Sequence, residues 1–312
     1  MPAPAPSGGI HLFRLFQIDV YLHWLWILVA VYEINTRGRS YSSIAWNVAE
    51  YLSLFLIVLL HEFGHALACK SGGGEAERIL LWPMGGVAYV NPQQRPGAVL
   101  WSIAAGPLVN VVLAPVLLGA FLLMRSQVLP ASPDLSHFVK SLLSIDVGLL
   151  IFNLLPIYPL DGGQILRALL WFVMGRSRSL MVASGIGLLG AAAGMAGALY
   201  LGDLWLIVLA AFGLMWSWNG LQQGRRIAQM LELPQHHGIA CPACGVAPPA
   251  APLWKCPCGA EFDTFAAQAT CPQCGRRFET TACPHCGRHA PIEQWARVPA
   301  APILPAEGGS EG

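Results

Sequence analysis

Residues 51–65 read YLSLFLIVLLHEFGH, an apolar run that ends in two histidines four residues apart. On a helix, residues four apart lie on one face, so His61 and His65 can offer two imidazoles to one metal ion, with Glu62 beside them as a base. The alternative is a chance match. However, each ionisable group in a bilayer costs at least about 2.5 to 3.5 kcal/mol, so three of them within five residues indicate a stabilising partner.

The composition predicts an integral membrane protein. Hydrophobic residues make up 55% of the chain and charged residues 11%, against about 25% charged in an ordinary soluble domain. The net charge of +1 gives no bulk attraction to nucleic acid or to acidic substrates. The partners of the chain must therefore be inferred from its sites.

Apolar stretches long enough to span a bilayer recur six times along the chain. They cover approximately residues 18–35, 47–69, 97–124, 141–157, 179–201 and 203–219. Residues 165–174 are apolar but too few to cross, so we expect them to form an interfacial or re-entrant helix. Because no small-residue cleavage site follows the first stretch, we expect that stretch to be retained and not removed as a signal peptide.

The distribution of Lys and Arg predicts the orientation of the spans. With the amino terminus in the cytoplasm, the inner loops and flanks carry nine of these residues and the outer ones four. This asymmetry favours a cytoplasmic position for both termini, which puts HEFGH a short way below the cytoplasmic surface. The abundance of Ala, Gly and Pro fits a bacterial plasma membrane, with an archaeal or organellar membrane as the alternative.

A catalytic zinc ion takes three protein ligands and leaves a fourth position for water, so a third ligand is needed. The acidic residues inside or bordering the later spans are Asp146, Asp161 and Asp203. Asp161 stands in NLLPIYPLDGG, residues 153–163, whose prolines and glycines would break a helix and expose backbone, which membranes tolerate beside a polar cavity. The alternative is a helix-ending turn capped by Asp161.

Four motifs together resemble the site-2 protease family of intramembrane zinc metalloproteases. They are HEFGHALA at 61–68, WPMGGVAYV at 82–90, AGPLVN at 105–110 and NLLPIYPLDGGQILR at 153–167, in the order of that family. The resemblance implies that His61, His65 and Asp161 bind the catalytic zinc and that Glu62 is the catalytic residue. It also implies cleavage of transmembrane protein substrates in regulated intramembrane proteolysis.

Further polar residues in the spans are weaker candidates for the site. Asn153 is the first candidate, and Asn110 the second, for a donor that stabilises the negative charge of the tetrahedral intermediate, although either could instead be an interhelical hydrogen bond. Arg167 is expected either to orient a carboxylate or to anchor the topology. Cys69 is expected to be an apolar filler and His23 an interfacial residue.

Residues 76–92 (AERILLWPMGGVAYVNP) carry a turn signal between two apolar runs and predict a β-hairpin. A substrate helix must unwind locally before its backbone can be cut. The edge of the hairpin could accept the unwound segment by strand addition, which the family resemblance also implies. The alternative is a simple cytoplasmic loop at the interface.

Eight of the nine cysteines lie between residues 241 and 286, in CPACG, CPCG, CPQCG and CPHCG. Such pairs with following glycines predict two structural zinc sites, in addition to the catalytic one. Pairing in chain order is simplest and joins Cys241, Cys244, Cys256 and Cys258 in one site and Cys271, Cys274, Cys283 and Cys286 in the other. Interleaved pairing stays open. Disulfides are the alternative, which a reducing cytoplasm disfavours.

The charges of this cysteine-rich segment are balanced, with five Lys or Arg against four acids between residues 238 and 298. This is no basic footprint for nucleic acid. We therefore expect a cytoplasmic protein-docking role for the segment, besides contacts of the spans with membrane lipid. A non-enzymatic membrane zinc protein, acting as a scaffold or sensor, is the alternative function, but a structural zinc needs no base such as Glu62.

The expected fold class is an all-α polytopic membrane protein of about six transmembrane helices with a small membrane-associated β-hairpin, followed by a cysteine-rich zinc-ribbon β module. The expected parts are an N-terminal segment (1–17), a transmembrane metalloprotease domain (18–226), a linker (227–240), a tandem zinc-ribbon-like module (241–298) and a disordered tail (299–312). Residues 1–9 are also expected to be disordered.

Overall fold

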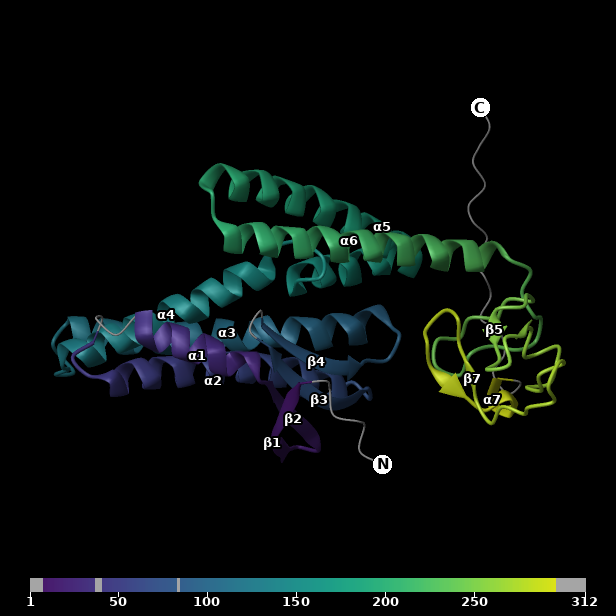
Figure 1. Cartoon of the computed structure of the whole chain (residues 1–312), viewed down its shortest axis with the longest axis horizontal. Helices are drawn as coiled ribbons and strands as arrows, with labels where there is room; N and C mark the ends of the chain where they lie inside the picture. The colour runs from purple at the N-terminus through teal and green to yellow at the C-terminus, as the bar shows by residue number, and fades with distance from the viewer. Residues whose placement is uncertain (1–7, 37–40, 83–84, 296–312) are drawn as a thin grey trace. The chain divides into compact units, whose positions relative to one another are not determined.

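The computed structural model describes residues 8–36, 41–82 and 85–295. The chain forms two compact units, residues 1–221 and 222–312, each of which is described by itself (Figure 1). The expected disordered tail, 299–312, and most of the expected disordered start, residues 1–7, lie outside the described residues.

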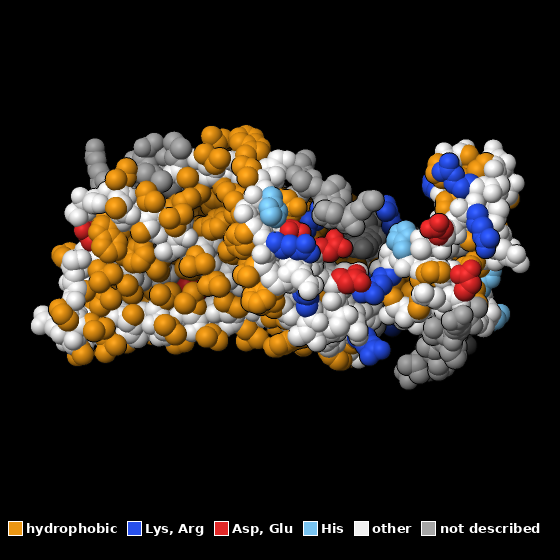
Figure 2. Space-filling model, turned by 90° about the horizontal axis from the view of Figure 1, so that it is seen from below, with side chains coloured by type: hydrophobic (Ala, Val, Ile, Leu, Met, Phe, Trp, Pro, Cys, Tyr) orange, Lys and Arg blue, Asp and Glu red, His pale blue; other side chains and the backbone are white. Residues whose placement is uncertain are grey.

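Within the described residues, five helices are long and apolar enough to cross a membrane. They are α2 (Ile44–Ser71), α3 (Pro96–Arg125), α4 (Pro133–Leu154), α5 (Asp161–Leu201) and α6 (Leu204–Glu232). Large apolar side chains on these helices stay exposed, as expected of surfaces that face lipid: Val112 is 67% and Leu189 75% exposed. Hydrophobic side chains accordingly cover the broad helical surface at the left of Figure 2.

The expected first span, residues 18–35, is wrong as a single helix. Its first part is strand β2 (Ile18–His23), and its second part is α1 (Leu25–Thr36), whose 12 residues reach only about 18 Å. The strand forms because apolar and polar residues alternate in IDVYLH, so that Ile18 and Val20 are fully buried on one face. Among the residues that the structure describes, length and composition therefore give five spans and not six.

Helix α5 consists of two helices joined at Gly175, whose φ of 77° and ψ of 173° break the helical path. The first, residues 161–174, is about 21 Å long at 1.5 Å per residue and is too short to cross a bilayer. The expected separate helix at 165–174 is thus present, and it begins four residues earlier at Asp161.

A four-stranded sheet in the order β1-β2-β3-β4 packs against α2. The predicted hairpin at 76–92 is confirmed: β3 (Glu75–Trp82) pairs antiparallel with β4 (Gly85–Asn91). Strand β1 (Gly9–Leu15) was not expected; it forms a second hairpin with β2, and β2 in turn pairs parallel with β3. The apolar core between this sheet and α2 contains Ile79, Leu81 and Phe63.

Helices α2 and α3 approach closely beside the HEFGH motif. A Cβ atom at Gly64 would lie 2.6 Å from the Ala105 carbonyl oxygen, so only glycine fits there. Small residues at such contacts let membrane helices pack backbone to backbone. This contact brings the AGPLVN segment of α3 against the histidines of α2.

The second unit holds two short hairpins and a final turn of helix. They are β5 (Trp254–Lys255) with β6 (Glu261–Phe262), β7 (Thr281–Ala282) with β8 (His289–Ala290), and α7 (Ile292–Trp295). The expected linker 227–240 is instead structured: residues 227–232 continue α6, and the Ala250 amide donates to the Pro234 carbonyl at 2.6 Å. The backbone of this segment forms hydrogen bonds within the second unit.

Candidate metal centres

The structure brings His61, His65 and Asp161 together from α2 and the start of α5. The two Nε2 atoms lie 3.1 Å apart, and Asp161 Oδ2 lies 3.0 Å from His61 Nε2 and 3.3 Å from His65 Nε2. Both histidines are buried, and the Asp161 side chain is 14% exposed. The glycines that follow Asp161 permit this placement, because a Cβ at Gly162 would lie 2.3 Å from the Leu154 carbonyl oxygen at the end of α4.

The partners of the two Nδ1 atoms determine which nitrogen of each ring can bind a metal. His65 Nδ1 lies 2.9 Å from the Ser102 carbonyl oxygen, which can only accept, so Nδ1 carries the proton and donates. His61 Nδ1 likewise lies 2.6 Å from Asn110 Oδ1. Both Nε2 atoms then present lone pairs to each other and to the Asp161 carboxylate, an arrangement that a cation stabilises.

The spacing of these three donor atoms fits zinc. Ligands at the usual 2.0 to 2.1 Å from a tetrahedral zinc are about 3.3 Å from one another. The three observed separations, 3.0 to 3.3 Å, are close to this value. Two imidazoles and one carboxylate are a typical donor set of catalytic zinc, with the fourth position left for water.

Glu62 is a residue of α2, and its side chain faces strand β4. Its side chain is 6% exposed, and its carboxylate accepts a hydrogen bond from the Ala88 backbone amide. A Cβ at Gly86 would come within 2.2 Å of Glu62 Cγ, so the glycine makes room for the carboxylate. Because the Ala88 amide points to Glu62, that side of β4 faces the carboxylate.

Gly106 of the AGPLVN motif lies against both imidazoles. A Cβ there would be 2.2 Å from His65 Nε2 and 2.8 Å from His61 Nε2. Sequence reasoning missed Gly106, Gly86 and Ser102 as parts of the site. Gly86 in WPMGGVAYV and Gly106 in AGPLVN could have been found from the sequence, because glycine inside a helix or strand often marks a close approach to another group.

The two asparagine candidates lie in different places. Asn110 is fully buried in α3, accepts from His61 and donates from Nδ2 to Asp146 Oδ1 at 2.7 Å. The NH₂ group of Asn110 thus faces Asp146, and the amide lies on the Nδ1 side of His61, away from Nε2. The expectation of an oxyanion donor does not fit this position. The alternative of an interhelical hydrogen bond does. Asn153 lies half-buried in the last turn of α4, outside the cluster of His61, His65 and Asp161.

Three further residues lie outside the cluster as well. The Arg167 guanidinium stands 6.0 Å from the centre of the Trp171 ring and forms no ion pair with a carboxylate among the described residues. Cys69 is buried and donates to the Glu75 carbonyl oxygen, which suits a small apolar filler. The His23 ring stacks on Trp82 at 5.7 Å, at the end of β2.

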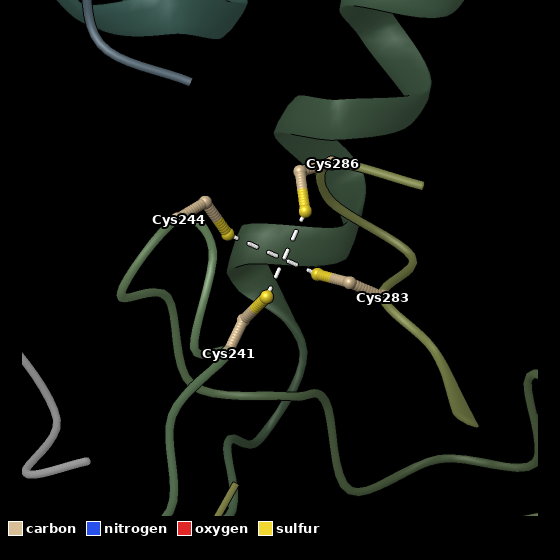
Figure 3. Close-up of side chains that lie close together, drawn as sticks. All are labelled: Cys241, Cys244, Cys283 and Cys286. Atoms are coloured by element: carbon tan, nitrogen blue, oxygen red, sulfur yellow. Dashed lines mark hydrogen bonds between the residues drawn. The ribbon is translucent and has the colours of Figure 1, made fainter. Parts of the chain in front are cut away.

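The eight cysteines of the second unit form two groups of four free thiols. One group contains Cys241, Cys244, Cys283 and Cys286, whose side chains converge in Figure 3, and the other contains Cys256, Cys258, Cys271 and Cys274. Within each group, sulfur atoms of the two cysteine pairs are 3.6 to 3.9 Å apart. Four thiolates at 2.3 Å from a tetrahedral zinc would be about 3.8 Å apart, so both groups fit zinc and neither fits a disulfide.

The pairing in chain order is wrong. The first and last cysteine pairs share one group and enclose the other group, so the arrangement is nested. The fully buried Trp295 explains it: this residue packs in one core with Cys241 and Cys283, and its carbonyl accepts from the Ala240 amide at 3.2 Å. The chain after the last pair thereby closes onto the chain before the first.

Each cysteine pair is followed by a glycine with φ between 71° and 94°, at Gly245, Gly259, Gly275 and Gly287. Each of these glycine amides donates to the carbonyl of the first cysteine of its pair, at 2.8 to 2.9 Å. At Cys271, burial raises the pKa of the thiol, but hydrogen bonds from the Cys274 and Gln273 amides lower it, and the resulting pKa is about 7. The turn at this pair therefore favours the Cys271 thiolate, the form of cysteine that binds zinc.

Comparison with known proteins identifies the family of the membrane unit. The model of peptidase family M50 matches residues 49–133 and 126–197. These ranges contain the HEFGH, AGPLVN and Asp161 segments, whereas the cysteine-rich unit lies outside them.

Several curated proteins are similar to this chain. A zinc metalloprotease of Methanocaldococcus jannaschii is 36% identical over 179 residues, which are 57% of this chain and 50% of that protein. Stage IV sporulation protein FB of Bacillus subtilis is 30% identical over 155 residues, 48% of this chain and 46% of that protein. The chain spans about half the length of these curated relatives.

A solved structure titled site-2 protease from Methanocaldococcus jannaschii matches with a TM-score of 0.49 and 32% identity, over 68% of this chain and 95% of that one. With its four motifs, the donor set on α2 and α5, the family match and the curated relatives, the chain belongs to peptidase family M50, the site-2 protease family of membrane zinc metalloproteases.

Proposed function

We propose that this protein is an intramembrane zinc endopeptidase that hydrolyses peptide bonds in or beside transmembrane helices of other membrane proteins. The observation that carries the proposal is the convergence of His61, His65 and Asp161, with Glu62 next to them, between helices apolar enough to cross a membrane. Relatives named zinc metalloproteases support it. Regulated intramembrane proteolysis would be the biological setting.

His61 and His65, through Nε2, and Asp161, through its carboxylate, would hold the catalytic zinc. Zinc in such a site polarises a carbonyl and lowers the pKa of water toward about 7. Glu62 would take one proton from the attacking water, and the new carbon–oxygen bond would form as that proton leaves. Glu62 would then give the proton to the departing amine nitrogen as the carbon–nitrogen bond breaks, so the carboxylate is regenerated.

Strand β4 would present the substrate to Glu62. β4 stands at one edge of the described sheet, and its Ala88 amide already points to the Glu62 carboxylate. A locally unwound substrate segment added to this edge would run past the base at hydrogen-bonding distance of β4. Gly86 leaves the space that the Glu62 side chain occupies beside this edge.

Asn153 remains a proposed donor for the developing negative charge, because it precedes Asp161 by eight residues and carries an uncharged amide. Replacing Asn153 with Ala should slow cleavage at least about tenfold while zinc stays bound. Unchanged turnover would remove this residue from the mechanism.

The second unit would carry two structural zinc ions in its four-cysteine groups, giving three zinc ions per chain. All four positions around each ion would be filled by sulfur, which suits a structural and not a catalytic role. We further propose that this unit docks cytoplasmic proteins, with both termini on the cytoplasmic side of a bacterial plasma membrane. Deletion of residues 238–312 tests the docking role, because unchanged substrate choice and rate would contradict it.

The decisive experiment compares the full chain with its Glu62→Gln variant on a panel of transmembrane helices in detergent or vesicles. Wild type should cleave at least one of them, whereas Glu62→Gln, which keeps the size of the side chain but cannot accept the proton, should lose at least about a hundredfold in rate. Zinc content should remain equal in the two proteins. Undiminished cleavage by Glu62→Gln would overturn the mechanism.

A further inference from the structure

A second carboxylate, Asp146 of α4, lies beyond Asn110 in the same buried network. Asp146 is fully buried, and its Oδ1 accepts from Asn110 Nδ2 at 2.7 Å. Its other oxygen, Oδ2, has no hydrogen-bond partner among the described residues. A carboxylate in such a place is costly inside a membrane protein, so it points to a function rather than to stability.

The chemistry of the three groups fixes the direction of every hydrogen bond between them. Asn110 Nδ2 donates to Asp146 Oδ1, so the NH₂ group of the amide is turned toward Asp146. Its carbonyl oxygen then faces His61 Nδ1 at 2.6 Å, and Nδ1 must carry the proton. The Nε2 atom of His61 is left without a proton, as a metal ligand must be.

Without Asp146, this selection would be lost. The Asn110 amide could rotate by half a turn and present its NH₂ group to His61 Nδ1, which would then act as the acceptor. His61 would in that case carry its proton on Nε2, the atom that faces His65 and Asp161. The orientation of one amide therefore decides whether His61 is a zinc ligand.

We propose that Asp146 is a positioning residue that acts through Asn110 to hold His61 in its metal-binding tautomer and to strengthen that ligand. This inference rests on the zinc site of the proposed function. It assigns a role to α4, which supplies none of the three metal ligands. Partners of this kind behind a histidine ligand typically change metal affinity by about 10 to 100-fold.

The test measures zinc bound at the membrane site of the full chain, with graded chelator, in wild type and in Asp146→Leu, Asn110→Leu and the double variant. A His61→Leu chain gives the zinc held by the cysteine groups alone, which is subtracted. Asp146→Leu and Asn110→Leu should each weaken zinc binding by about 10 to 100-fold, and the double variant by no more than the stronger single one. Additive losses would mean separate roles and would overturn the proposal.

Two further variants separate positioning from general damage. Asp146→Asn keeps an oxygen that can accept from Asn110 Nδ2, so it should restore most of the zinc affinity lost in Asp146→Leu. Asn47→Leu is the matched control, because Asn47 is also a buried polar residue of a spanning helix, 6% exposed, but lies outside the site. An equal loss of zinc in Asn47→Leu would contradict the proposal.

If Asp146→Leu does not fold, the nitrogen-15 resonances of His61 in the wild-type chain decide. The proposal requires a proton on Nδ1 and zinc on Nε2, and the reverse assignment would overturn it. Neither zinc affinity nor these resonances depends on cleavage. A chain that cleaves nothing but loses zinc in Asp146→Leu would therefore retain this inference while the proposed function fails.

Discussion

The two kinds of metal centre in this chain differ in what holds them. In the membrane unit, three donors come from α2 and α5, and their positions are set by glycine contacts between helices and by the hydrogen bonds that His61 and His65 donate to oxygen atoms on α3. In the cysteine-rich unit, eight donors in two groups of four come from turns next to two-residue strands, and the cysteines themselves form much of the core. The scaffold positions the ligands in the first case, whereas metal would organise the scaffold in the second.

Removal of zinc should therefore unfold the cysteine-rich unit and leave the membrane unit folded, and this is the largest effect that we expect. Structural zinc contributes about 10 to 16 kcal/mol in small zinc modules, so strong chelation should unfold residues 241–295. The spanning helices should stay folded, because helix packing maintains them. Hydrogen exchange on the full chain measures both, and a cysteine-rich unit that stays protected after zinc removal would break the comparison.

Gly106→Ala should remove zinc from the membrane site alone. The added methyl group would lie 2.2 Å from His65 Nε2. It is attached to the backbone of helix α3, which cannot shift easily. We expect the zinc content to fall from three to two per chain, with loss of cleavage. Gly119→Ala, on the same helix but with nothing within 4 Å of the added carbon, is the control and should keep all three. A Gly106→Ala chain with full zinc would show that the ligands can move.

The nested pairing predicts that two double variants lose different numbers of zinc ions. Cys241→Ser with Cys283→Ser changes one group and should cost one zinc ion per chain. Cys241→Ser with Cys256→Ser changes both groups and should cost two. Pairing in chain order would reverse the two results, so metal analysis of the two purified proteins distinguishes the arrangements.

The smallest expected effect concerns the base and not the metal. Gly86→Ala would push a methyl group within 2.2 Å of Glu62 Cγ, so the carboxylate must shift on its flexible side chain. We expect cleavage to slow by at least about tenfold, since small displacements of a catalytic group are costly, while zinc content remains that of wild type. Gly148→Ala, with open space around the added carbon, should cleave normally. A loss of zinc in Gly86→Ala would contradict this expectation and would show that the position of Glu62 also affects metal binding.

Much of the membrane site could be predicted because it is coded locally. The i, i+4 spacing of His61 and His65, and the helix-breaking residues around Asp161, are visible in the chain. The hairpin at 76–92 was visible for the same reason. For Asn110 the sequence left two roles open, because the choice depends on Asp146, 36 residues further on, and on which groups meet when α3 and α4 pack.

Two errors have equally specific causes. Strand β2 resembles the start of a span in the sequence, because hydropathy summed over 18–35 hides the alternation within IDVYLH. The pairing of the cysteines could not be inferred, because the intervals between successive pairs are similar and the decisive contact, Trp295 with Cys241 and Cys283, is long-range.

The nesting of the cysteine groups also sets an order of assembly. The inner group closes over Cys258 and Cys271, which are 13 residues apart, and the outer over Cys244 and Cys283, 39 apart. The longer loop costs about 1 kcal/mol more in chain entropy, and this excess falls once the inner group has formed. The unit should therefore load zinc from the inside outward and release it in reverse. Under zinc scarcity, the ends of the unit would come apart while its centre stayed folded.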